Sequence, residues 1–253
     1  MLNSVYFREP GASALEGMMF LHDYIMCICI IIFSIVGWFT FVIVYSFGVR
    51  LPSSKESFAM DKRVRMRLRP YGNNRHRVLE IVWTVFPALI LGAIAIPSFS
   101  VLYAIERPRY YDVVVKVGGN QWYWSYTVIA DFDEDMKIYR YDSYIISEED
   151  LKFGELRLLE VDNPLVLPAK VGIKFIVSAD DVIHSFSVTE LGIKIDAVPG
   201  RANRVWSSLE RTGVFRGQCS ELCGVNHGFM PIVIHSVSYG DFMTWLNKKI
   251  EVN

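Results

Sequence analysis

The sequence predicts a transmembrane helical hairpin followed by an all-β domain, a sandwich or a barrel. Two runs of the chain lack any charged residue, 24–49 with 26 residues and 81–105 with 25. Each is longer than the roughly 20 residues that a helix needs to cross about 30 Å of hydrocarbon. Beyond the second run, apolar and polar residues alternate with the period of half-buried strands. The mean hydropathy of +0.26 therefore reflects two local segments.

The first 23 residues carry little positive charge. Arg8 stands against three acids, Glu9, Glu16 and Asp23. A transit peptide would be rich in arginine and poor in acids, and a secretory signal would open with a positive region. Residues 1–23 are therefore expected to be an N-terminal segment without an import signal, as in a chain made inside its organelle.

The segment between the two runs sets the expected orientation of the hairpin 24–105. Residues 50–80 contain nine lysines or arginines against three acids. Short basic loops stay on the side from which a chain is inserted, so this loop is expected to face the cytoplasm or the mitochondrial matrix, with both termini opposite. Arg65, Arg67 and Arg69 would also suit a nucleic-acid patch. Beside two spans the topological interpretation is favoured, and no nucleic-acid partner is expected.

The second domain is expected to begin near Glu106 and Pro108, where charge and proline end the apolar run, and to cover 106–253. Short stretches with strand-like alternation follow one another, separated by turn residues at Asn163, Pro199 and Gly213. The expected strands are 113–117, 156–161, 171–177, 184–188, 204–208, 213–218 and 232–237. An amphipathic helix is expected to close the chain, with Phe242, Trp245 and Leu246 inward. Short strands at this spacing indicate a sandwich or barrel.

A cluster of metal-ligating residue types lies late in the domain. Cys219, Cys223, His227 and Met230 follow one another within twelve residues, and His184 lies 35 residues before Cys219. Thiolate and thioether favour copper, and imidazole serves either of its oxidation states. One cysteine, two histidines and a methionine would describe a mononuclear blue-copper site. The second cysteine allows two thiolates to bridge two copper ions, with one histidine for each.

Three other interpretations compete with copper. A Cys219–Cys223 disulfide would leave the histidines and the methionine without a role. A zinc site of two cysteines and two histidines fits the ligand count but leaves Met230 unexplained. The spacing also follows a helical period, although Gly224, Gly228 and Pro231 punctuate the stretch as a loop.

The chain resembles cytochrome c oxidase subunit II over almost its whole length. The resemblance rests on the two spans and on the motifs QWYWSY at 121–126, GELRLLEVD at 154–162, DVIHSF at 181–186, GIKID at 192–196, PGR at 199–201, GQCSELCG at 217–224 and NHGFMPI at 226–232. It implies a cupredoxin-like Greek-key domain with a dinuclear copper centre. That centre would take electrons from cytochrome c and pass them to haem in subunit I, where oxygen is reduced to water and protons are pumped.

The resemblance also assigns roles to particular residues. It implies that His184 and His227 supply imidazoles, that Cys219 and Cys223 bridge, that Met230 is axial, and that the carbonyl of Glu221 is the last ligand. The side chain of Glu221 would help to hold Mg²⁺ at the border with subunit I. Glu80, at the start of the second span, would lie at the mouth of a proton path, although an acid there also suits a helix N-terminus.

The route by which electrons enter is expected to involve Trp122, the exposed member of the aromatic stretch, with Trp124 given to the core. Asn120 stands where the family often has histidine. Residues 106–253 hold 21 acids and 16 basic residues, a net charge of −5. The acids expected to form a docking field for a basic partner are Asp131, Asp133, Glu134, Asp135, Asp180 and Asp181.

Several related functions are weighed against this one. A copper-binding assembly protein would need the ligands but not the aromatic stretch and the acidic field. A quinol oxidase subunit would lack the copper ligands, and a soluble reductase would lack the hairpin. The expected location is the mitochondrial inner membrane with the copper domain in the intermembrane space. A bacterial plasma membrane with the domain in the periplasm is the second choice.

Overall fold

A computed structural model describes residues 6–47, 75–132 and 135–251. Most of the predicted basic loop 50–80 lies outside the described residues, and so do two of the predicted docking acids, Asp133 and Glu134. The described chain forms two compact units. One is Leu21–Phe99, and the other joins Met1–Phe20 to Ser100–Asn253.

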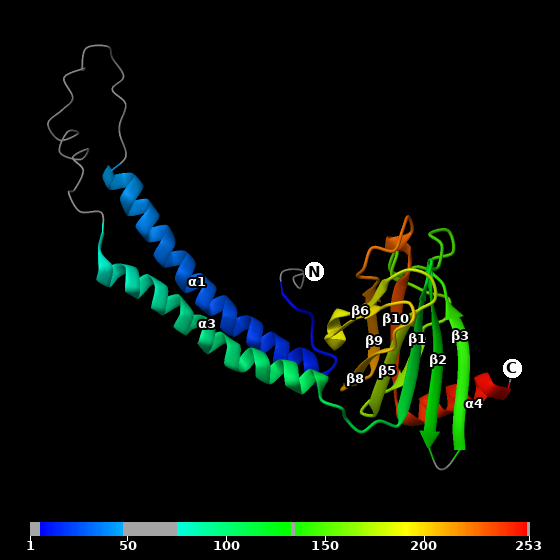
Figure 1. Ribbon diagram of the computed structural model, residues 1–253. Helices are drawn as coiled ribbons and strands as arrows, with labels where there is room; N and C mark the ends of the chain where they lie inside the picture. Colours follow the sequence, from blue (N-terminus) through cyan, green and yellow to red (C-terminus); the bar gives the residue numbers. More distant parts are fainter. Residues whose placement is uncertain (1–5, 48–74, 133–134, 252–253) are drawn as a thin grey trace, which may run out of the picture. The chain divides into compact units, whose positions relative to one another are not determined.

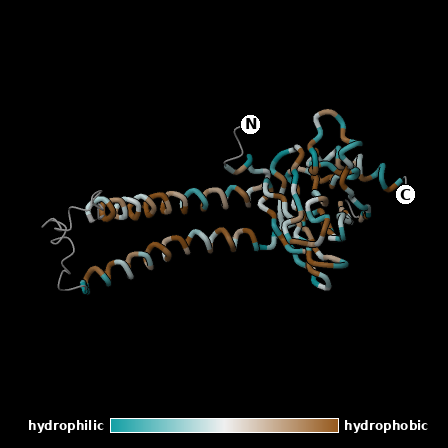
Figure 2. Tube along the Cα trace, turned by 90° about the horizontal axis from the view of Figure 1, so that it is seen from above, coloured by the Kyte–Doolittle hydropathy of each residue, from teal (hydrophilic) through white to brown (hydrophobic). Residues whose placement is uncertain are grey.

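The first unit consists of the greater parts of two long helices, α1 (Ser13–Phe47) and α3 (Arg77–Glu106). Both are long and apolar enough to cross a membrane, and hydrophobic residues recur along each of them (Figure 2). Pro87 and Pro97 lie inside α3, which neighbouring groups can tolerate in a membrane helix. The helix α1 begins eleven residues before its uncharged run. Its first turn contains Glu16, and a carboxylate is favourable at that end of a helix.

The second unit contains the predicted all-β domain (Figure 1). A five-stranded sheet has the order β3-β2-β1-β5-β8, a three-stranded sheet the order β4-β10-β9, and β6 pairs with β7. The pairs β1–β5 and β4–β10 are parallel, so the chain crosses over between strands. The strands are β1 (Val113–Asn120), β2 (Tyr123–Phe132), β3 (Asp135–Ser143), β4 (Leu165–Pro168), β5 (Gly172–Ala179), β6 (His184–Val188), β7 (Ile193–Ala197), β8 (Asn203–Ser208), β9 (Gly213–Gln218) and β10 (Pro231–Val237).

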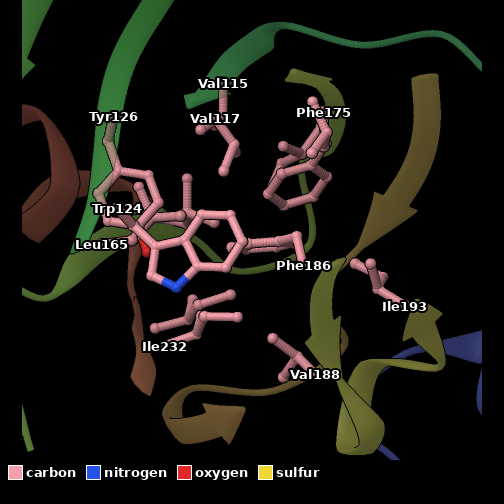
Figure 3. Packing of buried hydrophobic residues seen from close by; sticks show 14 of the residues in the cluster. Val115, Val117, Trp124, Tyr126, Leu165, Phe175, Phe186, Val188, Ile193 and Ile232 are labelled. Carbon is pink, nitrogen blue, oxygen red and sulfur yellow. The ribbon is translucent and has the colours of Figure 1, made fainter. Parts of the chain in front are cut away.

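The core lies between the sheets and is dominated by large rings. Trp124, Phe175, Phe186 and Phe215 are buried, and Figure 3 shows the first three meeting near Ile232. The rings of Trp124 and Phe186 meet edge to face with centroids 5.4 Å apart, a favoured aromatic geometry. The core position expected for Trp124 is confirmed.

One predicted strand is wrong. Residues 156–161 form a turn in which the N–H of Leu159 donates to the carbonyl of Leu156 at 3.1 Å. Leu158 has a φ of 62°, in the left-handed region that breaks an extended strand. Only Val161 makes a bridge, to Ile145. The alternation of apolar residues in this segment resembles that of a strand, but the hydrogen bond within residues 156–159 is that of a turn.

The closing helix α4 (Tyr239–Glu251) is present as predicted. Phe242 and Leu246 are buried, while Trp245 is half-buried and meets the ring of Tyr139 on β3 edge to face. The hydroxyl of Ser238 accepts a hydrogen bond from the N–H of Asp241 at 3.2 Å, which satisfies one of the free donors at the helix N-terminus.

The N-terminal residues 6–15, which we call the strap, belong to the β-domain. The N–H of Gly11 donates to the carbonyl of Glu190 at 2.8 Å, and the N–H of Glu210 donates to the carbonyl of Gly11 at 2.9 Å. Arg8 pairs with the carboxylate of Glu190 at 2.7 Å. A Cβ atom on Gly11 would collide with the ring of Phe215. The sequence had set residues 1–23 apart from this domain.

Candidate metal centre

The donor residues meet because the ends of three strands lie together. His184 opens β6, while residues 219–230 connect β9 to β10, which are antiparallel neighbours. We call this connection the donor loop. The N–H of Ser220 donates to the carbonyl of Ser185 at 3.1 Å, so the donor loop is fixed beside β6. Within it, a short 3-10 turn, η2 (His227–Phe229), precedes Met230.

Five predicted ligand side chains lie close together in the structure. Sγ of Cys219 is 4.0 Å from Sγ of Cys223, and the ligand atoms of these two residues and of His184 all lie within 4.8 Å of one another. Sγ of Cys223 lies 3.5 Å from Nδ1 of His227 and 3.5 Å from Sδ of Met230.

The sixth predicted ligand is a main-chain oxygen. The carbonyl oxygen of Glu221 lies 3.4 Å from Sγ of Cys219. Both cysteines are buried and are not joined by a disulfide. Two thiols, two imidazoles, a thioether and a carbonyl are therefore gathered around Cys219 and Cys223, a donor set suited to copper.

The carboxylate of Asp181 orients the ring of His184. Its Nε2 lies 2.8 Å from Oδ1 of Asp181, while its Nδ1 is buried and has no hydrogen-bond partner in the part of the chain that the structure describes. A buried polar atom without a partner is costly, and a metal ion would satisfy this one. The arrangement matches the carboxylate–histidine pairs that fix the tautomer of metal-ligating imidazoles.

Asp181 accepts two further hydrogen bonds, both from main-chain N–H groups. Burial tends to raise its pKa, but hydrogen bonds from His184 and from the N–H groups of Val182 and Gln121 outweigh this and lower the pKa. The backbone donors lie at 2.6 Å from the carboxylate in both cases. Asp181 is therefore a carboxylate built into the site. The sequence had grouped it with surface docking acids.

The thiol of Cys223 is protonated in the absence of metal. Burial and the neighbouring Cys219 raise its pKa to about 12. Thiolate is the form that binds metal, so metal binding must displace this proton.

The aromatic stretch holds the donor loop from the other side. The side-chain amide of Gln121 donates to the carbonyl of Cys223 at 2.8 Å, and Nε1 of Trp124 donates to the carbonyl of Met230 at 3.1 Å. Gly224 lies against the ring of Trp122, which a Cβ atom would approach to 3.1 Å. Sequence reasoning missed the positioning contacts of Gln121 and Trp124, although their place in the QWYW motif was a signal.

Trp122 is half-buried, less exposed than the surface position expected from the sequence. Its indole nitrogen has no partner among the described residues. Around the centre, large apolar side chains of the donor loop are exposed: Leu222, Val225 and Phe229. The side chain of Glu221 is exposed as well, and so is that of Asp180.

The predicted acidic field is divided, because Asp181 contacts His184 at the centre whereas Asp131 lies away from it. Asp131 is near the end of β2 and pairs with Met136 on β3, whereas Trp122 comes just before the start of β2. Nine residues of extended chain span about 30 Å. Asp135 begins β3 beside Asp131 in the same hairpin, and only its backbone is described. Asp131 is close to the aromatic stretch in the sequence but not in space, because the two lie at opposite ends of one extended strand.

Glu80 lies in the first turn of α3 with its side chain exposed. The hydroxyl of Thr84 donates to its carbonyl at 2.9 Å. It belongs to the helical unit.

Comparison with known proteins gives consistent matches along the chain. The family model described as cytochrome c oxidase subunit II, periplasmic domain, matches residues 113–237, and the model for the transmembrane domain of that subunit matches residues 2–101. The cytochrome c oxidase subunit 2 of Cyanidium caldarium is 40% identical over 96% of this chain and 90% of its own length. That of Neurospora crassa is 41% identical over 97% of this chain and 92% of its own.

A solved structure is similar to the β-domain. The periplasmic domain of subunit II of cytochrome oxidase from Bradyrhizobium japonicum is 40% identical, covers 56% of this chain and 96% of its own, and has a TM-score of 0.49.

Proposed function

The chain belongs to the cytochrome c oxidase subunit II family, and from this premise we propose that its β-domain binds two copper ions and receives electrons from a cytochrome c. The family makes it a membrane-anchored subunit of the terminal oxidase complex. In the proposed reaction the electrons continue to haem in subunit I, where oxygen is reduced to water and protons are pumped.

The clustering of six donors around Cys219 and Cys223 carries the copper proposal. Cys219 and Cys223 would be shared between the metals, with His184 and His227 serving one each. Met230 and the carbonyl of Glu221 would complete the set. A bound copper pair supplies one-electron redox chemistry. The soft thioether at 3.5 Å from Sγ of Cys223 favours copper over zinc, for which thioether is a poor ligand.

The chain's own groups would keep the centre rigid while its charge changes. Asp181 holds the ring of His184, and Gln121 and Trp124 hold two carbonyls of the donor loop. Limited movement favours electron transfer because a fixed environment needs little reorganisation. Contacts that orient metal ligands are worth about tenfold to a hundredfold in metal affinity.

Cytochrome c is proposed to dock over the donor end of the domain, with Trp122 as the point at which electrons enter. Trp122 lies against Gly224 of the donor loop, which supports a short path. Asp180 and the exposed Glu221 supply negative charge there for a basic partner. Asp131 lies at the other end of β2 and is not given this role.

Two residue roles and the location of the protein belong to the same proposal. The exposed carboxylate of Glu221 would take part in a Mg²⁺ site against subunit I. Glu80, exposed in the first turn of α3, would lie where protons enter. The compartment is proposed to be the mitochondrial inner membrane, with the β-domain in the intermembrane space. The homologues from Cyanidium caldarium and Neurospora crassa support that choice.

The test is a metal analysis of the full chain purified in detergent. We expect two copper ions per chain and a paramagnetic resonance spectrum in which one unpaired electron is shared by two copper nuclei. A single-copper spectrum, or zinc retained after loading with copper, would contradict the proposal. Stopped-flow reduction by cytochrome c then tests the proposed electron donor. If the chain holds two coppers but cytochrome c does not reduce it, the copper proposal stands and the proposed partner is wrong.

A further inference from the structure

The two middle rows of the outer face of the five-stranded sheet are basic, in a domain whose net charge is negative. The flanking rows of the same face hold Asp142 at one side and Asp131 at the other. The strand register places five side chains in one row across the sheet: Arg140, Thr127, Lys116, Ile176 and Arg204. The next row is Ile138, Ile129, Val114, Lys174 and Trp206. We call these ten side chains the basic sheet face. It carries four cations and no acid.

The side chains of this face point away from the core. Along β1 the burial alternates, so that Val113, Val115 and Val117 are buried while Val114 and Lys116 are not. Ile138 on β3 is 51% exposed, and Arg140 and Arg204 are exposed too. The helix α4 packs near Tyr139 and Tyr141, which alternate with Ile138 and Arg140 and therefore lie on the other side of β3.

The cations of the face have no acidic partner among the described residues. No ion pair links Lys116, Arg140, Lys174 or Arg204 to a carboxylate of the described chain. The ammonium of Lys174 instead lies 4.8 Å from the centre of the Tyr111 ring and 5.9 Å from that of Trp206. Aliphatic side chains stand between these charges. The combination of apolar area and unpaired charge of one sign is typical of a surface that another molecule covers.

We infer that the basic sheet face docks an acidic protein surface of the oxidase complex, one that presents carboxylates around an apolar patch. Charge complementarity selects the partner, because four cations attract acids and repel basic proteins. This face is therefore distinct from the acidic donor end proposed to receive a basic cytochrome. The inference rests on sheet register and charge and stands whether or not the copper proposal holds.

The first experiment identifies what touches the face. A photoreactive benzophenone amino acid replaces Ile138 in the full chain within the assembled oxidase, and a matched control carries it at Ile250, an exposed apolar position on α4. We expect position 138 to cross-link to one protein of the complex, at a segment containing Asp or Glu beside apolar residues, and position 250 not to reach that segment. Adducts to lipid alone, no adduct above the control, or a segment without acids would overturn the inference.

The second experiment tests the role of charge. Lys116→Glu combined with Arg140→Glu should reduce the yield of the 138 adduct about tenfold, because like charges then face each other. The control, Lys248→Glu with Lys249→Glu on α4, should leave the yield unchanged, and Lys116→Arg with Arg140→Lys should retain it. Where charge reversal lowers the amount of folded chain, Lys116→Gln with Arg140→Gln replaces it. Equal yields from face and control variants would overturn the inference.

Discussion

The two ends of the β-domain are built in opposite ways. At the donor end, residues 219–230 contain only the short turn η2, and the side chains of Gln121 and Trp124 hold them through hydrogen bonds. At the strap end, main-chain hydrogen bonds join Gly11 to Glu190 and Glu210, and Leu15 is buried. The donor end leaves Nδ1 of His184 without a partner among the described residues, whereas at the strap end the largely buried carboxylate of Glu190 is paired with Arg8.

The strap end therefore serves mainly the stability of the domain, and the donor end serves mainly metal binding. Apolar burial and paired backbone groups stabilise a fold, and the strap end provides both. Unpartnered donors in a buried site oppose stability until a metal binds. Changes at the donor end should therefore alter metal binding more than folding, and changes at the strap end should do the reverse.

The largest expected effect is the loss of copper on replacing one of the two cysteines, Cys219 or Cys223. Cys223→Ser should abolish the dinuclear centre, since the residue faces Cys219, His227 and Met230. The fold should persist without metal, and circular dichroism should retain its β-sheet signal. Copper analysis and paramagnetic resonance measure the loss. A variant that kept two coppers and a shared electron would show that Cys223 is not a bridge.

The next effect is expected at the carboxylate behind His184. Asp181→Asn should weaken copper binding by about tenfold to a hundredfold, the usual cost of removing a group that orients a metal-ligating histidine. Competition with a copper chelator measures it. Asp180→Asn is the matched control, because Asp180 is the exposed neighbour. Equal copper affinity in the two variants would argue that Asp181 acts only as a surface charge.

At the strap end, Gly11→Ala should destabilise the domain without altering the centre. The added methyl would collide with the ring of Phe215 and approach Leu191, and overpacking of this kind costs about 1–3 kcal/mol. Thermal unfolding of the chain in detergent gives the change in Tm. Gly240→Ala on α4 is the control, since nothing lies near the added atom. An equal Tm for both variants would mean that the strap adds no stability.

A smaller effect is expected for Met230→Leu. Leucine has a volume similar to that of methionine, so the substitution should lower the free energy of unfolding by less than about 1.5 kcal/mol. The main-chain carbonyl of residue 230, which accepts a hydrogen bond from Trp124, is unchanged. Loss of a weak axial thioether should shift the reduction potential while both coppers stay. Potentiometry and metal analysis measure the two quantities. An emptied site would assign Met230 a stronger role than axial.

The smallest effect is expected from Asp131→Asn. At about 0.1 M salt the Debye length is about 10 Å, well below the roughly 30 Å that separates Asp131 from Trp122 along β2. The rate of association with cytochrome c should remain unchanged, while Asp180→Asn at the donor end should lower it. Stopped-flow kinetics at that ionic strength compare them. A slower rate for Asp131→Asn would move the docking surface to the hairpin end.

The sequence by itself determined the features that depend on local composition. Two uncharged runs were sufficient to predict α1 and α3, because crossing a membrane requires only length and hydrophobicity. Alternation along β1 and β5 predicted buried faces, since the pleat gives a fixed period of two. The spacing of Cys219, Cys223 and His227 indicated a metal site, because one loop carries all three.

Tertiary structure alone decided how distant segments meet. The sequence suggested a strand at 156–161, but local hydrogen bonds and the left-handed Leu158 make it a turn. It grouped Asp131 with Asp181, whereas strand length separates one from the centre and a hydrogen bond to His184 builds the other into it. Such placements depend on strand register and on contacts across long stretches of chain, which composition and periodicity do not encode.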